Sequence, residues 1–198
     1  MRKIAITGTH GVGKTTLAHQ LCVCLKERQI NTVVIEEKAR ACPFPLNESA
    51  SVDTEIWMVH SQIRAELDAK ARRYDVAITD RCSLDAIVYW NDRNLKSPYF
   101  NLLEKASIQW AEHEYEHIIL VEPSSDTDFF AVDAVRDSGI SYRNRIRDLF
   151  RTYLDQLSFE SRQKIIYVQS DEIFQSQRYS LAVQKIMEKI QWDALVPC

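Results

Sequence analysis

The sequence predicts an α/β protein in which one parallel sheet is covered by helices, and three observations support this class. Five short runs rich in β-branched residues alternate with longer stretches of helical period. Each short run is almost continuously apolar, as a strand buried on both faces of a sheet should be. The 198 residues contain no linker and no internal repeat, so we expect a single domain over residues 1–198.

The predicted strands, in chain order, are KIAIT (3–7), TVVIE (32–36), VAIT (76–79), IILVE (118–122) and KIIYVQ (164–169). Helical patterns fill the gaps between them. The residues predicted to face the core are Leu17, Leu21 and Leu25 in segment 15–28, and Ile56, Val59, Ile63 and Leu67 in segment 53–73. Further helices are expected over 83–93 and 141–157, whereas two prolines make residues 41–50 a loop.

The composition is that of an ordinary globular protein and argues against several classes. With a net charge of −3, the surface as a whole gives no reason to expect nucleic-acid binding. No apolar run approaches the roughly 18 residues of a membrane helix, and we expect no membrane segment and no signal peptide. The five cysteines are odd in number and lack a C-x-x-C pair, which favours reduced thiols in a cytoplasmic protein. The sequence leaves open whether the chain forms a homodimer.

Residues 8–16, GTHGVGKTT, match the phosphate-binding pattern G-x-x-x-x-G-K-[ST]. The chain has only four glycines, and three of them lie within these residues, where backbone must wrap closely around a ligand. The pattern follows a predicted strand and opens a predicted helix, which is the context that it requires. We therefore expect an ATP-binding loop.

Each part of this loop has an expected task. The residues expected to hold the nucleotide are Gly8, Thr9, His10, Gly11, Val12, Gly13, Lys14, Thr15 and Thr16. Backbone N–H groups and the helix N-terminus surround the phosphates, and the side chain of His10 is given no role of its own. Lys14 should bridge the β- and γ-phosphates, and the Thr15 hydroxyl should be a ligand of Mg²⁺.

The segment DRCSLDA (80–86) narrows the class of phosphate chemistry. Asp80 comes at the carboxyl end of a predicted strand, where ligands of parallel sheets gather, and it could hold Mg²⁺ through water. A mechanical ATPase usually has Glu next, to polarise water, but this chain has Arg81, which suits an anionic group in transfer. The pattern N-K-x-D of switch GTPases is absent. A kinase is favoured, with an Asp80–Arg81 pair that merely caps the next helix as the alternative.

The motifs GTHGVGKTT, VIEEKAR (34–40) and ITDRCSLDA (78–86) together resemble the P-loop nucleoside and nucleotide kinases. The resemblance is closest to the deoxynucleoside-kinase-like branch and to small ATP-binding (AAA-type) domains related to ribosylnicotinamide kinase. It implies a three-layer fold with a five-stranded parallel sheet in the order 2-3-1-4-5. It also implies helices on both faces, a helix over the acceptor site, an arginine-bearing lid, and ATP with Mg²⁺ as cofactors.

Carried over by position, the resemblance assigns residues to the acceptor side. The family's carboxylate after the second strand falls at Glu36 or Glu37, where it would accept the proton of the acceptor hydroxyl. We favour Glu37, because E-x-A-R then places Arg40 nearby to orient the acceptor. A solvated pair of acids at the strand end is the alternative.

The resemblance extends to the turn after the third strand and to the helix over the acceptor. The arginine of the family's D/E-R-S motif falls at Arg81, but the cysteine in D-R-C-S leaves the match of Ser83 open. Trp57 and Gln62 resemble the aromatic and amide residues that stack on and read a base in deoxynucleoside kinases. A Trp on a helix is also a common core residue, so this assignment stays open.

The lid implied by the resemblance spans about 124–147, and Gly139 is a plausible hinge. Between residues 136 and 151 five arginines face two acids, in a chain whose total charge is negative. Arginines brought in by a closing segment stabilise the charge of the transferred phosphoryl group. We expect Arg136, Arg143 and Arg147 to act there and Arg145 and Arg151 to face solvent; a solvated basic face is the alternative.

The segment HEYEH (113–117) matches the zinc-protease pattern H-E-x-x-H but is rejected. Such a site needs both histidines on one helix, and here His117 directly precedes a predicted strand.

The sequence thus favours Mg²⁺-dependent transfer of phosphate from ATP to a small acceptor, first of all a nucleoside or nucleotide-like compound. A kinase of another small metabolite, and an ATP-binding regulatory module or ATPase without an acceptor, are the alternatives.

Overall fold

The computed structural model describes residues 1–124, 140–174, 179–190 and 192. Five strands form one sheet in the order β2-β3-β1-β4-β5, and every pairing in it is parallel. The strands are β1 (Arg2–Thr7), β2 (Thr32–Ile35), β3 (Val76–Asp80), β4 (His117–Glu122) and β5 (Ile165–Gln169). The predicted strands and the sheet order implied by the resemblance are therefore confirmed.

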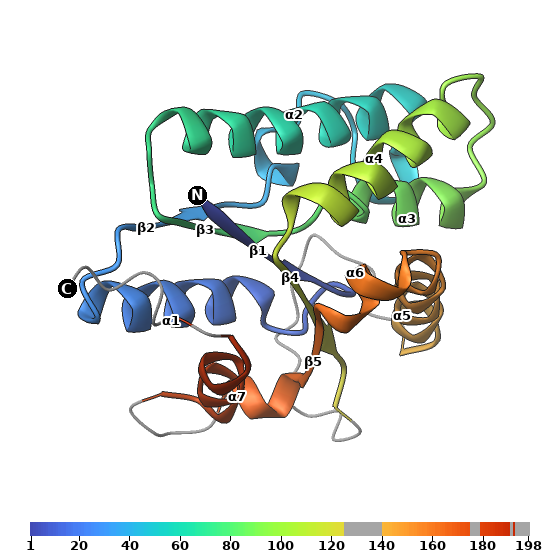
Figure 1. The fold of residues 1–198 in the computed structure, drawn as a ribbon. Coiled ribbons are helices and arrows are strands. Elements are labelled where there is room, and N and C mark those ends of the chain that lie inside the picture. The colour runs from blue at the N-terminus through green and yellow to red at the C-terminus, as the bar shows by residue number, and fades with distance from the viewer. Residues whose placement is uncertain (125–139, 175–178, 191, 193–198) are drawn as a thin grey trace.

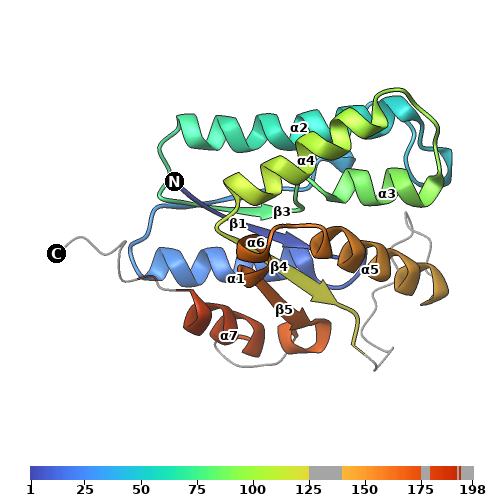
Figure 2. The same cartoon turned by 45° about the vertical axis from the view of Figure 1, so that its right-hand side comes forward.

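Helices cover both faces of the sheet in a three-layer α/β fold (Figures 1 and 2). The helices are α1 (Lys14–Glu27), α2 (Val52–Ala71), α3 (Asp85–Arg93), α4 (Phe100–Glu114), α5 (Ile140–Asp155), α6 (Phe159–Gln163) and α7 (Leu181–Lys189). In Figure 1, α2, α3 and α4 lie above the sheet and α1 and α7 lie below it. Short 3₁₀ turns, η1 (Ala39–Ala41), η2 (Asn47–Ser49) and η4 (Ser170–Ile173), complete the described elements.

The sheet separates the two larger hydrophobic clusters, each of which lies between the sheet and one helical layer. Ile4 and Ile6 on β1 belong to the cluster on the α1 side, whereas Ala5 between them belongs to the cluster with α3 and α5. The predicted face of α1 is confirmed, because Leu17, Leu21 and Leu25 are fully buried. Burial on both faces explains why the strands are apolar almost without alternation.

The predicted core face of α2 is confirmed except at Leu67. Val59 is buried, and the partly buried Ile56 and Ile63 pack against the same hydrophobic cluster, but Leu67 is 48% exposed. The helix turns a largely polar stripe inward, which consists of Thr54, Glu55, Val59, Gln62, Glu66 and Ala69. The polar residues of this stripe have partners on α3, α4 and β1, so their hydrogen bonds compensate for burial that apolar periodicity does not anticipate.

The zinc-protease interpretation of HEYEH is excluded by the positions of its two histidines. Helix α4 ends at Glu114 and Tyr115 is extended, so the histidines of HEYEH lie on different elements. Among the described residues, no group of three or more His, Cys, Asp and Glu side chains could hold a metal ion. In the described part of the chain, no helix combines the length and the apolar character needed to cross a bilayer.

Candidate active site

The phosphate-binding loop connects β1 to α1, as its motif requires. Gly8 and Gly13 have φ angles of +133° and +91°. A Cβ atom on Gly8 would lie 2.2 Å from the carbonyl oxygen of Val121, and one on Gly13 would lie 2.8 Å from the ring of Phe174. Glycine is required here by both conformation and space. Val12 is fully buried in the core and anchors the loop.

The start of α1 offers groups that suit phosphate oxygens. In the described part of the chain, no side chain caps the N-terminus of α1 and its first turn holds no acidic residue. Side chains therefore do not satisfy the backbone N–H groups at this end, and these groups suit an anion. Thr9 Oγ1 is buried and has no hydrogen-bond partner among the described residues. An anion held by main-chain amides fits both observations.

Lys14 lies at the centre of the charged groups. It is 5% exposed, and its Nζ donates to the carbonyl oxygen of Thr9 at 2.5 Å. Burial, and then the charge of Arg81, lower the pKa of Lys14 to about 7, against the opposing effect of the acids Asp85, Asp80 and Glu37. Phosphate oxygens placed against the amine would favour its charged form.

Thr15 and Asp80 form a pair that could hold Mg²⁺. The Thr15 hydroxyl donates to Asp80 Oδ2 at 2.5 Å, and Asp80 is 2% exposed at the end of β3. Because β1 and β3 are neighbours in the sheet, the residues that follow β1 and end β3 meet. A hydroxyl and a carboxylate are hard oxygen ligands, and Mg²⁺ characteristically completes such a pair with substrate phosphates and water.

The turn after β3 carries the next group of charges. Arg81 Nε and Nη2 donate to Glu37 Oε1 at 3.0 and 2.5 Å, and Nη1 donates to Asp85 Oδ1 at 3.0 Å. Asp85 Oδ2 in turn accepts from Thr7 Oγ1 and from the Cys82 N–H. Asp80 and Arg81 therefore have different partners, and the helix-capping pair considered from the sequence is not what forms.

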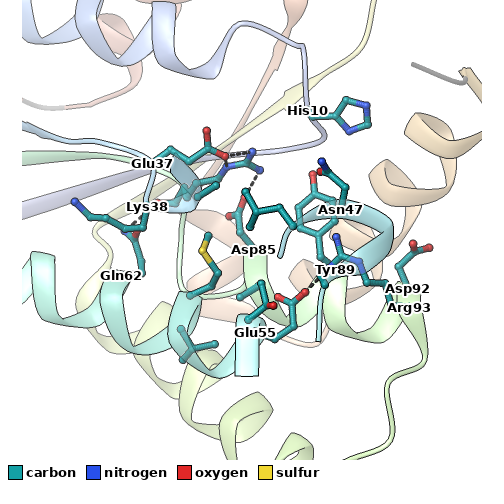
Figure 3. A pocket seen from close by; sticks show the side chains of 18 of the residues that line it. His10, Glu37, Lys38, Asn47, Glu55, Gln62, Asp85, Tyr89, Asp92 and Arg93 are labelled. Carbon is teal, nitrogen blue, oxygen red and sulfur yellow. Dashed lines mark hydrogen bonds and ion pairs between the residues drawn. The ribbon is translucent and has the colours of Figure 1, made fainter. Parts of the chain in front are cut away.

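A cavity of about 740 Å³ opens beside this turn (Figure 3). Its walls come from the phosphate loop, the segment after β2, α2, the turn after β3, α3 and α5. The lining residues are His10, Glu37, Lys38, Ala39, Arg40, Leu46, Asn47, Glu48, Ala50, Thr54, Glu55, Met58, Val59, Gln62, Arg81, Cys82, Ser83, Asp85, Ala86, Tyr89, Asp92, Arg93, Leu95, Tyr142 and Arg145. The volume is that of a typical small-molecule site.

A buried ion pair belongs to the wall between α2 and α3. Arg93 Nη1 donates to Glu55 Oε1, as Figure 3 shows, and Glu55 is 3% exposed. Burial raises the pKa of Glu55 to about 7, while the charge of Arg93 and its hydrogen bond act in the opposite direction. The ring of Tyr89 lies near two cations: its centroid is 5.8 Å from Arg81 Cζ and 5.6 Å from Arg93 Cζ.

The first turns of α5 close the cavity on the side of the phosphate loop. The ring of Tyr142 lies 5.6 Å from that of His10, and Arg145 Nε donates to Asp92 Oδ1 at 2.6 Å. Arg145 was expected to face solvent, and its side chain is 62% exposed. It also lines the cavity, because it reaches across to Asp92 on α3.

The other arginines of this region are placed differently. Arg143 is buried and Arg147 pairs with Asp148, and neither lines the cavity. Arg151 donates to Glu122 at 2.6 Å. Arg136, Gly139 and most of the expected lid lie outside the described residues.

The structure brings some of the expected acceptor residues to the cavity and not others. Glu37, Arg40 and Gln62 line it, whereas Glu36 is exposed and does not. Trp57 does not line it either, because the side of α2 toward the cavity carries Thr54, Glu55, Met58, Val59 and Gln62, and position 57 lies on another side of the helix.

Gln62 was expected to offer both a donor and an acceptor, and its donors are already used. Its Nε2 atom donates to Glu66 Oε1 at 2.9 Å and lies 3.4 Å from the carbonyl oxygen of Arg81. Both partners can only accept, so the orientation of the amide follows from their chemistry. The carbonyl oxygen is the group that Gln62 offers to the cavity.

Sequence reasoning missed Glu55, Asp92, Arg93, Tyr142 and Arg145. The available signal was the apolar pattern of α2, in which the acid at position 55 interrupts the expected face. The apolar pattern could not have shown that Glu55 pairs with Arg93, or Asp92 with Arg145, because each pair joins two different helices.

The AAA domain family model matches residues 3–165, more than half of the chain. The chain belongs to this family. Among curated proteins, no sequence matches it.

Several solved structures are similar to this chain, among them two of NadR and one of a thymidylate kinase. A NadR protein in complex with NR superposes with a TM-score of 0.67 at 21% identity, over 94% of this chain and 51% of the other. Thymidylate kinase from Ehrlichia chaffeensis superposes with a TM-score of 0.65 at 15% identity, over 96% of this chain and 98% of the other. NadR in complex with NAD and AMP-PNP gives 0.65 at 20% identity, over 96% of this chain and 51% of that one. The fold is thus of the P-loop nucleotide kinase type, and this chain spans about half the length of NadR.

Proposed function

We propose that the protein transfers the γ-phosphoryl group of ATP to a hydroxyl group of a small molecule bound in the cavity. One observation carries the proposal: the Glu37–Arg81 pair lies in the cavity wall and acts electrostatically on Lys14 of the phosphate loop. A carboxylate and a cation thus stand where a nucleotide phosphate and an acceptor would meet. A regulatory module or a simple ATPase would need no acceptor-sized cavity at this place.

The residues of the chain divide the work between the two substrates. Main-chain amides of the loop and Lys14 hold the phosphates, and Thr15 and Asp80 are the protein ligands for Mg²⁺. When bound, Mg²⁺ supplies neutralisation of the β- and γ-phosphate charge. Arg81 stabilises the charge of the group in transfer, and Glu37 orients the acceptor hydroxyl and takes its proton.

The acceptor that we favour is a nucleoside or nucleotide-like compound. The cavity has the volume of a small-molecule site and mixes apolar walls with a few polar groups. Since Gln62 offers a carbonyl oxygen, the acceptor should present an N–H or O–H donor to it. The neighbours in complex with NR and with AMP-PNP, and a thymidylate kinase, have the fold that such an activity would use.

The proposal is tested with Glu37→Gln, using Glu36→Gln as the matched control, because Glu36 is exposed outside the cavity. Removal of the base should lower kcat by roughly 10²-fold or more while binding of an ATP analogue is kept. ADP release is measured across nucleosides, nucleoside monophosphates and small phosphorylated metabolites, and the products are identified by mass spectrometry. Full phosphotransfer in Glu37→Gln would show that the base is assigned wrongly.

A further inference from the structure

A buried carboxylate under the cavity is used by no step of the proposed reaction. Glu66, on α2, is fully buried and accepts hydrogen bonds from four side chains. Oε1 accepts from Tyr115 Oη at 2.7 Å and from Gln62 Nε2 at 2.9 Å. Oε2 accepts from Trp110 Nε1 at 2.7 Å and from Lys3 Nζ at 3.2 Å. These four donors satisfy the charge and fix it in one orientation.

Two of these four donors also reach the turn after β3. Tyr115 Oη accepts from the Ser83 N–H at 2.9 Å, and Gln62 Nε2 lies 3.4 Å from the carbonyl oxygen of Arg81. The only proton of the Tyr115 hydroxyl goes to Glu66, so its oxygen is oriented to accept from Ser83. The carboxylate is thereby linked to both ends of the segment 81–83.

This turn needs such support. Arg81 has a φ of +113°, which is unfavourable for a residue with a side chain. Such a conformation persists only where the surroundings enforce it. Thr79 Oγ1 also donates to the carbonyl oxygen of Arg81, at 2.6 Å, and helps to hold this residue in place. If the turn relaxed, the guanidinium of Arg81 would leave Glu37 and Asp85.

We propose that Glu66 and Tyr115 are positioning residues that hold the turn 81–83 so that Arg81 faces the transferred phosphoryl group. The proposal rests on the proposed function for its effect on turnover. Its structural part, the hold of Tyr115 on the turn, does not depend on any activity. Neither residue touches a substrate; both act through the backbone of the turn.

The test compares Tyr115→Phe with the control Tyr153→Phe. Tyr153 is 2% exposed, and the substitution removes a hydroxyl that donates to Glu104 Oε1 and accepts from Asn91 Nδ2, neither of which belongs to the turn. Cys82, 2% exposed within the turn, supplies a readout that needs no substrate. Its rate of alkylation is followed by mass spectrometry of the peptide that contains it.

In Tyr115→Phe, we expect alkylation of Cys82 to become about tenfold faster, as expected if the lost hydrogen bond contributes about 1.4 kcal/mol to keeping the turn closed. We expect kcat to fall by a similar factor, with the KM for ATP unchanged. The control should lower the melting temperature without either effect. Unchanged alkylation and kcat in Tyr115→Phe would overturn the proposal and leave Glu66 a purely structural residue.

Two further outcomes keep the test decisive. Faster alkylation of Cys82 in a protein that phosphorylates no acceptor would support the hold on the turn and reject phosphotransfer. If Tyr115→Phe does not fold, hydrogen exchange of the wild-type Ser83 amide decides instead. Slow exchange is expected from its bond to Tyr115, and exchange as fast as that of an exposed turn would overturn the proposal.

Discussion

The phosphate-binding loop and the cavity beside it are built by opposite means. The loop is one continuous stretch, residues 8–16, and the groups that it offers at the start of α1 are mainly backbone amides. The cavity is made of side chains from six separate segments, and ion pairs such as Glu55–Arg93 and Asp92–Arg145 join its walls. Backbone can hold any triphosphate, whereas side chains from many elements can select one acceptor. Changes in the loop should therefore affect every reaction, and changes in the cavity should affect particular acceptors.

The largest effect is expected from Lys14→Met, which removes the cation at the centre of the loop. Loss of one charge that stabilises the group in transfer should lower kcat by about 10³-fold for every acceptor. Lys26→Met is the matched control, because Lys26 is exposed in the last turn of the same helix. Steady-state kinetics with two unlike acceptors give the measurement. A fall in kcat with only one of the two acceptors would contradict the view that the loop serves every reaction and the cavity only particular acceptors.

A smaller and more selective effect is expected from Arg145→Ala. Arg145 lines the cavity and pairs with Asp92, so its loss should raise the KM of the acceptor about tenfold and leave the KM of ATP unchanged. Arg64→Ala is the control, since Arg64 forms an exposed ion pair with Asp68 away from the cavity. An equal rise in the KM of ATP would mean that α5 serves the donor side as well.

The smallest effect is expected on stability, from Glu55→Gln. Burial raises the pKa of Glu55 from 4.5 to about 7, so the folded protein holds this proton more tightly than the unfolded chain does. The stability that this gives is fully present below about pH 4.5 and is lost as the pH rises to about 7. Between about pH 4.5 and 7 the melting temperature of the wild type should therefore fall, and in Glu55→Gln this fall should be smaller by a few degrees.

Melting curves from about pH 4.5 to 8 check this, with Glu48→Gln as the control. Glu48 lines the same cavity but is exposed. An identical pH dependence in Glu55→Gln and the wild type would show that Glu55 keeps an ordinary pKa.

The same contrast explains what the sequence could predict. Strands buried on both faces give continuous apolar runs, and the loop motif consists of consecutive residues, so the sheet, α1 and the loop between β1 and α1 were predicted. Glu55 carries no such mark, because its partner Arg93 depends on how α2 is rotated. The rotation is decided by buried polar contacts between elements, and apolar periodicity misses these contacts, as the exposed Leu67 shows.

Arg81 is a residue whose place in the site could be predicted from its motif but whose conformation could not. Its position after Asp80 marked it as a site residue, but nothing in the sequence gives its positive φ or the hold of Tyr115 on the next residues. Trp57 shows the reverse, since a plausible pattern on a helix placed it at the acceptor, and the geometry of α2 puts it elsewhere.

The central claim is that phosphate passes from the loop to a molecule in the cavity, and the fate of the γ-phosphate tests it most directly. The protein is incubated with MgATP and a pool of hydroxyl-bearing nucleosides and metabolites, and ADP, inorganic phosphate and phosphorylated products are quantified together. We predict ADP and one phosphorylated acceptor in equal amounts, with little inorganic phosphate. ADP matched only by inorganic phosphate, whichever acceptor is present, would contradict the account.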